Sequence, residues 1–188
     1  MSRTLLRTTL LCLGILCASP SLARVEVESG VQQPLGRVLV AKVSEDIAPG
    51  DYEALLKGLR AHPGKFARKI LLLDSIGGST VEAMRMGRLL RETGFDVLIP
   101  SNAVCQGSCV YLLAAGRKRN VRGHVAIHRP HYPAGESAQA RLAGMPHDTA
   151  GYLREMGVAP DLASDMQAIA PQRMKLLGPQ ELARYRLY

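Results

Sequence analysis

Asp74-Ser75-Ile76-Gly77-Gly78-Ser79 is the stretch that decides the fold, because an apolar run precedes it and an amphipathic segment follows it. The run Ile70–Leu73 has no polar residue, which is typical of a strand buried on both faces of a parallel sheet. Ser79 can cap the next helix, and Gly94 has the right position to end it. The stretch therefore predicts a strand, a glycine turn and a helix in succession.

The same alternation of strand and helix continues along the chain. Further strands are expected over residues 37–43, 96–99 and 124–128, and further helices over 51–61, 109–115, 148–157 and 160–169. This spacing predicts βαβ units with right-handed crossovers, hence an α/β fold with a mostly parallel sheet in a single domain. Residues 130–147 are rich in Pro, Gly, Ala and Ser, and are predicted to form a loop excursion.

The N-terminus has the features of a targeting segment. Arg3 and Arg7 precede the apolar run Leu10–Cys17, which is too short to span a bilayer. Ser21-Leu22-Ala23 places small residues where a signal peptidase cuts, so cleavage is expected after Ala23. The alternative, a first core helix, is disfavoured by Pro20. We therefore expect a signal peptide over 1–23, an extended lead-in over 24–36 and one domain over 37–188.

Charge and composition exclude several classes of partner. The leader carries two basic residues and no acidic one, so the net charge falls from +8 to +6 on cleavage. The positive charges are scattered, and aromatic residues make up only 4% of the chain, too few for a nucleic-acid stacking platform. No other stretch is long and apolar enough to predict a membrane span. We expect no nucleic-acid partner and no membrane insertion after cleavage.

Two cysteines remain after cleavage, Cys105 and Cys109. An exported pair is usually oxidised. Within one regular helix their Cβ atoms would be about 5–6 Å apart, too far for a bridge. A disulfide therefore requires Cys105 to precede the helix, which Gly107 permits; the alternative is two buried thiols. Neither this pair nor the nearby histidines have a convincing metal-ligand spacing, so no metal or cofactor is expected.

The glycine turn could serve acyl-transfer chemistry. Such chemistry needs a nucleophile, a base within hydrogen-bond reach and N–H donors directed at the developing oxyanion. Because Gly77 and Gly78 have no Cβ atoms, the backbone can approach a ligand closely. A glycine pair of this kind more often serves only the turn. Other motifs must therefore decide whether Gly77 and Gly78 form an oxyanion site.

Three motifs together resemble the proteolytic subunit of the Clp protease and its periplasmic relatives. They are Gly77-Gly78-Ser79, Leu112-Leu113-Ala114-Ala115-Gly116 and Ile127-His128-Arg129-Pro130. The resemblance covers roughly residues 37–188 and implies the spiral of ββα units shared by the Clp protease and crotonase families. It also implies an oxyanion site at Gly77 and Gly78, and His128 as the base.

Two catalytic positions depart from the family pattern. The nucleophilic serine is expected nine positions before Gly116, which is Gly107, and Ser108 comes one place late. One residue turns a helix by about 100°, so Ser108 is expected to point away from the nucleophile position. The family's acid position falls on Met174, which cannot orient an imidazole. Asp161 and Asp165 are better explained as solvent-exposed helix residues.

Three functions are compatible with these motifs. The first is an exported, periplasmic, degenerate member that binds a peptide or protein with weak or no hydrolase activity, with Gly77, Gly78 and Gly107 forming the ligand site. The second is a serine hydrolase that uses Ser108 and His128. The third, an acyl-CoA enzyme of the crotonase type, requires cytoplasmic CoA and is disfavoured by export. Self-association is expected by analogy with the family.

Overall fold

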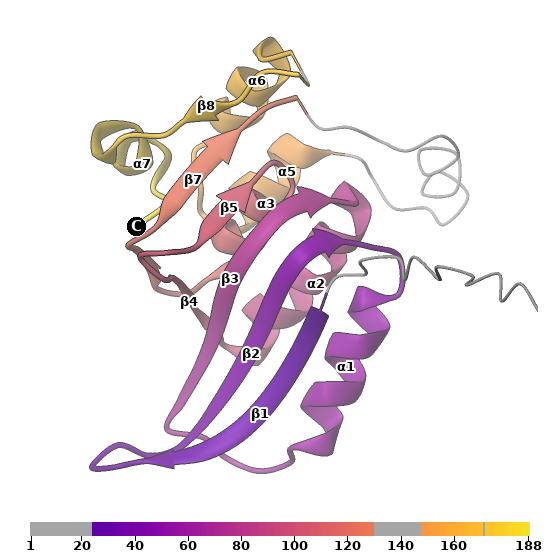
Figure 1. Cartoon of the computed structure of the whole chain (residues 1–188), viewed down its shortest axis with the longest axis vertical. Helices are drawn as coiled ribbons and strands as arrows, with labels where there is room; N and C mark the ends of the chain where they lie inside the picture. The colour runs from indigo at the N-terminus through magenta and orange to yellow at the C-terminus, as the bar shows by residue number, and fades with distance from the viewer. Residues whose placement is uncertain (1–23, 130–147, 171) are drawn as a thin grey trace, which may run out of the picture.

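The computed structural model describes residues 24–129, 148–170 and 172–188, which form one α/β domain of eight strands and six helices (Figure 1). The predicted signal peptide and the 130–147 excursion lie outside the described residues. In chain order the elements are β1 (Arg24–Gln32), β2 (Gly36–Ile47), α1 (Asp51–Ala61), β3 (Arg68–Gly78), α2 (Thr80–Thr93), β4 (Asp96–Ile99), β5 (Val104–Gln106), α3 (Cys109–Ala115), β6 (Arg119–Val121), β7 (His124–Ile127), α5 (Thr149–Glu155), α6 (Asp161–Ala168), β8 (Lys175–Leu176) and α7 (Pro179–Tyr185).

The strands form a single mixed sheet that is mostly parallel. Its main order is β1-β2-β3-β5-β7-β8, and β4 and β6 form a branch beside the first half of β3. Among the strands that the structure describes, only the β1–β2 and β7–β8 pairs are antiparallel. The predicted α/β class with a mostly parallel sheet is thus confirmed.

The lead-in expected over 24–36 is instead largely a strand, β1, paired with β2 along its whole length. Val25 and Val27 alternate with Glu26 and Glu28, as in a strand with one face covered. Val27 packs against α1, since a Cβ on Gly58 would lie 2.5 Å from Val27 Cγ2. Because the segment is polar, its sequence did not indicate that it forms an edge strand.

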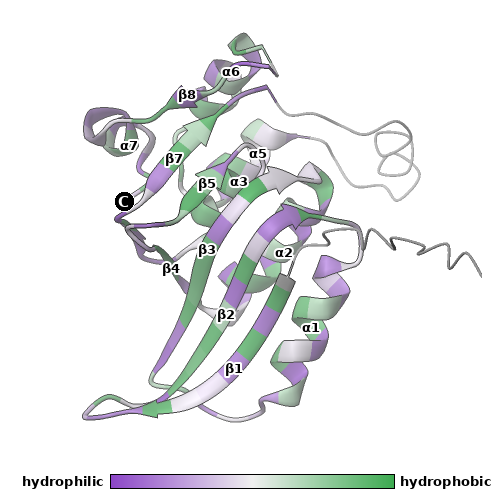
Figure 2. Ribbon diagram, viewed as in Figure 1, coloured by the Kyte–Doolittle hydropathy of each residue, from purple (hydrophilic) through white to green (hydrophobic). Residues whose placement is uncertain are grey.

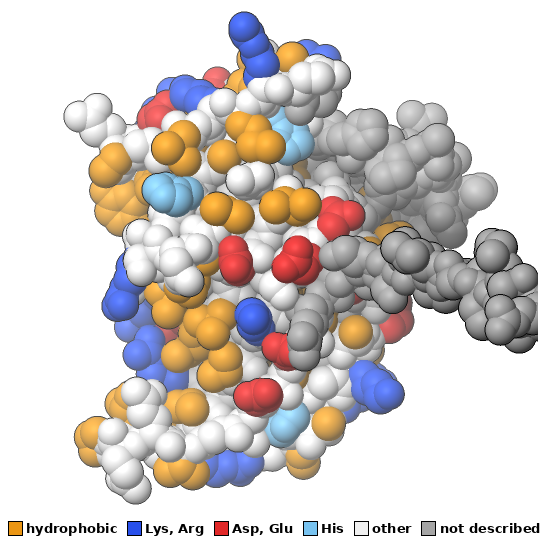
Figure 3. Space-filling view, in the orientation of Figure 1, with side chains coloured by type: hydrophobic (Ala, Val, Ile, Leu, Met, Phe, Trp, Pro, Cys, Tyr) orange, Lys and Arg blue, Asp and Glu red, His pale blue; other side chains and the backbone are white. Residues whose placement is uncertain are grey.

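The described helices cover only one face of the β1–β3 part of the sheet; in Figure 1 α2 lies behind these strands and α1 lies beside β1. Leu71 and Leu73 point to that face and are fully buried, whereas Ile70 and Leu72 point to the other face and are half-buried. The expected burial of Ile70–Leu73 on both faces is therefore wrong. Hydropathy alternates along β1–β3 in Figure 2, and Figure 3 shows hydrophobic and charged side chains mixed on the open face.

The helix ends follow the sequence signals. Ser79 Oγ accepts a hydrogen bond from the Glu82 N–H at 3.2 Å and so caps α2, and Gly94, with φ of 84°, ends it. Within the described ranges, no helix combines the length and apolar character that a membrane span needs.

One arginine joins the carboxyl ends of three helices. The Arg119 guanidinium donates hydrogen bonds to the carbonyls of Ala114 at the end of α3, Met156 after α5 and Arg186 after α7, at 2.6, 2.6 and 2.9 Å. A cation is stabilised there by the negative end of each helix dipole. Burial, followed by the neighbouring charge of Arg91, lowers the pKa of Arg119 to about 10.

Candidate functional site

The residues singled out in the sequence meet at the carboxyl ends of the parallel strands. β3 ends with Gly77 and Gly78, Gly107 follows β5, and His128 follows β7. β3 and β5 are neighbours, as are β5 and β7. In open α/β sheets this edge is where ligands bind. The fold thus brings the glycine pair, the Gly107–Ser108 turn and His128 to one place.

Gly107 lies directly against the imidazole of His128. A Cβ on Gly107 would be 2.5 Å from His128 Nε2 and 3.1 Å from Cε1. Gly107 has a φ of 53°, in the left-handed region, and its N–H donates to the Ala126 carbonyl at 3.0 Å. The position where the resemblance places a nucleophile therefore faces the expected base but carries no side chain.

Ser108 is turned toward β3. Its side chain is buried, with the residue 5% exposed, and its Oγ donates a hydrogen bond to the Gly78 carbonyl at 3.0 Å. Among the described residues, Ser108 Oγ makes no hydrogen bond with His128. In this arrangement His128 is not paired with the serine hydroxyl that it would have to activate.

His128 is oriented by a backbone carbonyl. Its Nδ1 lies 2.8 Å from the Arg129 carbonyl oxygen. Because a carbonyl can only accept, Nδ1 donates this hydrogen bond, and in that neutral tautomer Nε2 can accept one. Arg129 is held by α6, since its N–H donates to the Ile169 carbonyl at 3.0 Å and its Nε to the Gln167 carbonyl at 2.9 Å.

The acids considered in the sequence do not reach this ring. Asp165 accepts from Arg184 at 3.0 Å and from the Tyr185 hydroxyl at 2.5 Å. Asp161 is exposed at the start of α6, and Met174 is 58% exposed. Within the described residues, no carboxylate bonds to His128, so the Arg129 carbonyl occupies the orienting role that an acid has in a catalytic triad.

The glycine pair is required by close packing. A Cβ on Gly77 would lie 2.7 Å from the Gln106 carbonyl oxygen, and one on Gly78 would lie 2.2 Å from the Ile47 carbonyl oxygen. The Gly77 N–H donates to Ser75 Oγ at 3.2 Å, so it is already engaged. Any side chain at either position would separate β3 from the end of β2 or from the turn after β5.

The Ser108 N–H is a donor that the motifs did not identify. It has no acceptor among the described residues, and its nitrogen lies 3.1 Å from the position a Cβ on Gly77 would take. The residue after a nucleophile often supplies such a donor, and this rule could have identified it. The site therefore brings together an N–H donor in the turn after β5 and the imidazole that follows β7.

A disulfide encloses this turn. Cys105 in β5 and Cys109 at the start of α3 are joined, with a Cα–Cα distance of 5.3 Å, and both are fully buried. Cys105 precedes the helix, as the bridge requires, and the predicted disulfide is confirmed. The bridge closes a short loop around Gly107 and Ser108.

The electrostatic surroundings are acidic on the β2 side. Asp46 lies beside Gly78, with its Oδ1 2.4 Å from the position of a Cβ there. Burial raises the pKa of Asp46 above its ordinary value. In the part of the chain that the structure describes, no group of three His, Cys, Asp or Glu side chains could hold a metal ion.

Comparison with known proteins gives no family assignment. No protein-family model matches the chain, and no curated protein matches it significantly. Interpretation of the site therefore depends on its geometry and on the motifs in the sequence.

Proposed function

We propose that this chain is a degenerate relative of the Clp protease subunit, which binds a peptide or protein segment and has weak or no hydrolase activity. One observation carries the proposal: Gly107 faces His128 Nε2, while Ser108 Oγ donates to the Gly78 carbonyl. Removing the nucleophile of a serine triad costs on the order of 10⁶ in turnover. A site of this composition favours binding over catalysis.

Two hydrogen-bonding groups of this site suit an extended peptide backbone. His128 Nε2 can accept from a peptide N–H, and the Ser108 N–H can donate to a peptide carbonyl. Such paired main-chain contacts are typical of peptides bound along a strand. Ile76, 57% exposed, adds apolar surface one residue before Gly77 near the end of β3.

Hydrolysis is the rival function for the same residues. It requires Ser108 Oγ to leave the Gly78 carbonyl and to approach His128 within about 2.6–3.2 Å. It also requires the His128 imidazole, which now lies against Gly107, to be oriented toward the Ser108 hydroxyl.

Two further features belong to the proposal. We assign the fold to the spiral of ββα units of the Clp protease and crotonase families, which is supported by the mostly parallel sheet and the shared motifs. We assign the protein to the periplasm, which is supported by the predicted leader and by the Cys105–Cys109 disulfide, since such bonds persist in oxidising compartments.

Fluorescence polarisation with labelled, end-blocked decapeptides tests the binding function. His128→Ala should weaken binding by about 2–10-fold, the value of one hydrogen bond of 0.5–1.5 kcal/mol. Ser108→Ala keeps the N–H and should bind within about twofold of the wild type. His124→Ala, at an exposed histidine at the start of the strand that precedes His128, is the matched control. If no peptide binds, or if peptides are cleaved in a Ser108-dependent manner, the proposal is wrong.

A further inference from the structure

A basic pocket lies at the opposite end of the sheet from His128. It has a volume of about 490 Å³ and is formed by the amino ends of β3, β4 and β6 and the carboxyl end of α2. β3 begins in this pocket at Arg68 and ends at Gly78, so about 30 Å of strand separates the two sites. The pocket is therefore independent of the peptide site.

Four positive side chains and a single carboxylate line this pocket. The lining residues are Phe66, Ala67, Arg68, Lys69, Thr93, Gly94, Asp96, Arg117 and Lys118. The lining thus carries an excess of three positive charges. In a concave site such charges add to a focused positive potential, which attracts anions.

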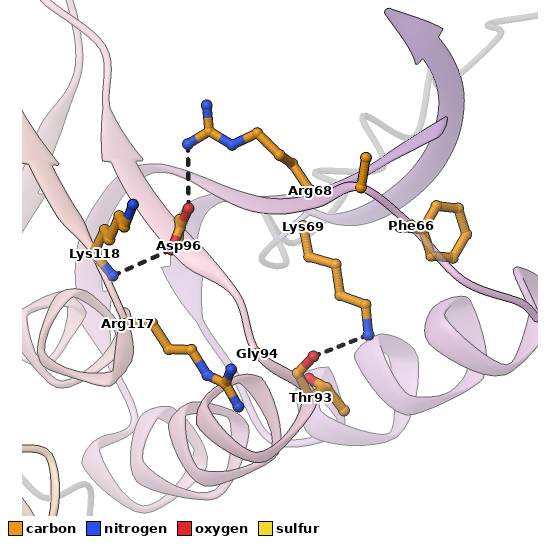
Figure 4. Close-up of a pocket in the computed structure, with 9 residues that line it drawn as sticks. Phe66, Arg68, Lys69, Thr93, Gly94, Asp96, Arg117 and Lys118 are labelled. Carbon is orange, nitrogen blue, oxygen red and sulfur yellow. Dashed lines mark hydrogen bonds and ion pairs between the residues drawn. The ribbon is translucent and has the colours of Figure 1, made fainter. Parts of the chain in front are cut away.

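Two of the cations are already engaged. Arg68 forms an ion pair with Asp96 at 3.2 Å, and the other Asp96 oxygen accepts from the Lys118 backbone N–H at 3.2 Å. The Lys69 ammonium donates to the Thr93 carbonyl at 2.9 Å, at the end of α2. Figure 4 shows these contacts, with Phe66 at one end of the pocket. They are explained by the fold alone.

The other two cations have no ion-pair partner in the described ranges. Neither the Arg117 guanidinium nor the Lys118 ammonium has an ion pair or hydrogen bond with any residue in the described ranges. Arg117 lies along Gly94, and a Cβ there would be 3.2 Å from the Arg117 Cζ. Gly94 thus leaves space for the guanidinium beside the pocket.

We propose that this pocket binds a phosphate-bearing anion, with Arg117 and Lys118 as its principal contacts and Arg68 as a third. A phosphomonoester has a charge of about −1.5 to −2 and three acceptor oxygens, which offsets the excess charge better than one carboxylate does. The guanidinium fork suits phosphate oxygens. The volume lies in the usual range for small-ligand pockets, so pyrophosphate or a phosphorylated headgroup fits the same chemistry.

Isothermal titration with pyrophosphate at low ionic strength tests the proposal, and sedimentation with vesicles containing phosphatidic acid distinguishes a lipid source of the phosphate. The test variant is Arg117→Gln/Lys118→Gln. The matched control is Lys42→Gln/Lys57→Gln, which removes two exposed charges that do not line the pocket. The thermal unfolding midpoint of each variant verifies folding.

Saturable pyrophosphate binding that falls at least tenfold in the test variant and persists in the control supports a soluble ligand. Vesicle binding alone, with the same dependence, supports a phosphate presented by a lipid. Binding of neither probe, or binding equal in wild type and test variant, overturns the proposal. Peptide binding at the His128 site is measured separately, so failure of either proposal is distinguishable from failure of the other.

Discussion

Replacement of Gly87 by Ala tests the packing that holds α2 against α5. A Cβ on Gly87 would lie 1.9 Å from the Tyr152 hydroxyl oxygen and 3.3 Å from Ala115 Cβ. Tyr152 is 1% exposed, and its hydroxyl donates to the Tyr111 carbonyl at 2.8 Å. The tyrosine must therefore move, and the buried hydroxyl loses its acceptor.

Three free-energy contributions decide whether Gly87→Ala stabilises or destabilises the fold. Ala in place of Gly within a helix gains about 1 kcal/mol. Leaving a buried hydroxyl unsatisfied costs about 1–3 kcal/mol, and overpacking a core costs about 1–3 kcal/mol. We expect Gly87→Ala to lower the free energy of unfolding by about 1–5 kcal/mol in urea denaturation.

Tyr152→Phe provides the internal control. Without the hydroxyl, the nearest atom to the new methyl group is the ring carbon Cζ, at 3.1 Å. Gly87→Ala should therefore cost less in the Tyr152→Phe background, by at least about 1 kcal/mol of coupling in a double-mutant cycle. Unchanged or increased stability of Gly87→Ala alone, or an equal cost in both backgrounds, would refute the packing argument.

Three further predictions concern stability. Arg119→Met should lower the free energy of unfolding by about 2–4 kcal/mol, because three helix ends lose a charged donor. Each such hydrogen bond is worth roughly 1.5–3 kcal/mol before the structure relaxes. As a control, Arg117→Met removes an exposed arginine and should change the free energy of unfolding by less than about 0.5 kcal/mol. Reduction of the Cys105–Cys109 disulfide should cost about 2 kcal/mol, from the entropy of a five-residue loop, measured as the shift in chemical denaturation with reductant; the Cys105→Ala/Cys109→Ala variant should show no such shift. Burial, followed by Glu82 and Asp46, raises the pKa of Asp51 against the opposing hydrogen bond from Ala48. The folded state thus holds this proton more tightly than the unfolded state, so the free energy of unfolding should fall as pH rises above the ordinary Asp pKa of 3.8. Asp51→Asn should reduce that slope between pH 3.5 and 6, and an unchanged slope would contradict the assignment.

Much of the fold was predictable because local signals were strong. The helix from Asp51, the Ser79 cap, the Gly94 end and the strand over 96–99 all occur as expected. The short strands β5, β6 and β8 were missed, because two or three residues carry no periodicity. α7 was also not identified as a helix, although Pro179 occupies a favourable first-turn position.

The site was predictable in position but not in its contacts. Counting nine positions back from Gly116 identified Gly107 as the nucleophile position of the family pattern. The structure places Gly107 against His128. The sequence could not show that the Arg129 carbonyl orients the imidazole, or that Ser108 Oγ donates to the Gly78 carbonyl, because both depend on side-chain rotamers. The unpaired charges of Arg117 and Lys118 likewise required knowledge of which strands begin side by side.

The central claim, that this site binds without an activated serine, is tested most directly by fluorophosphonate labelling of the purified protein. Mass spectrometry would locate any adduct, with His128→Ala as the control and an authentic serine hydrolase as the positive reference. Because Ser108 Oγ is hydrogen-bonded to Gly78 rather than to His128, we predict no adduct under conditions that label the reference fully. An adduct on Ser108 that disappears in His128→Ala would contradict this account and establish a hydrolase.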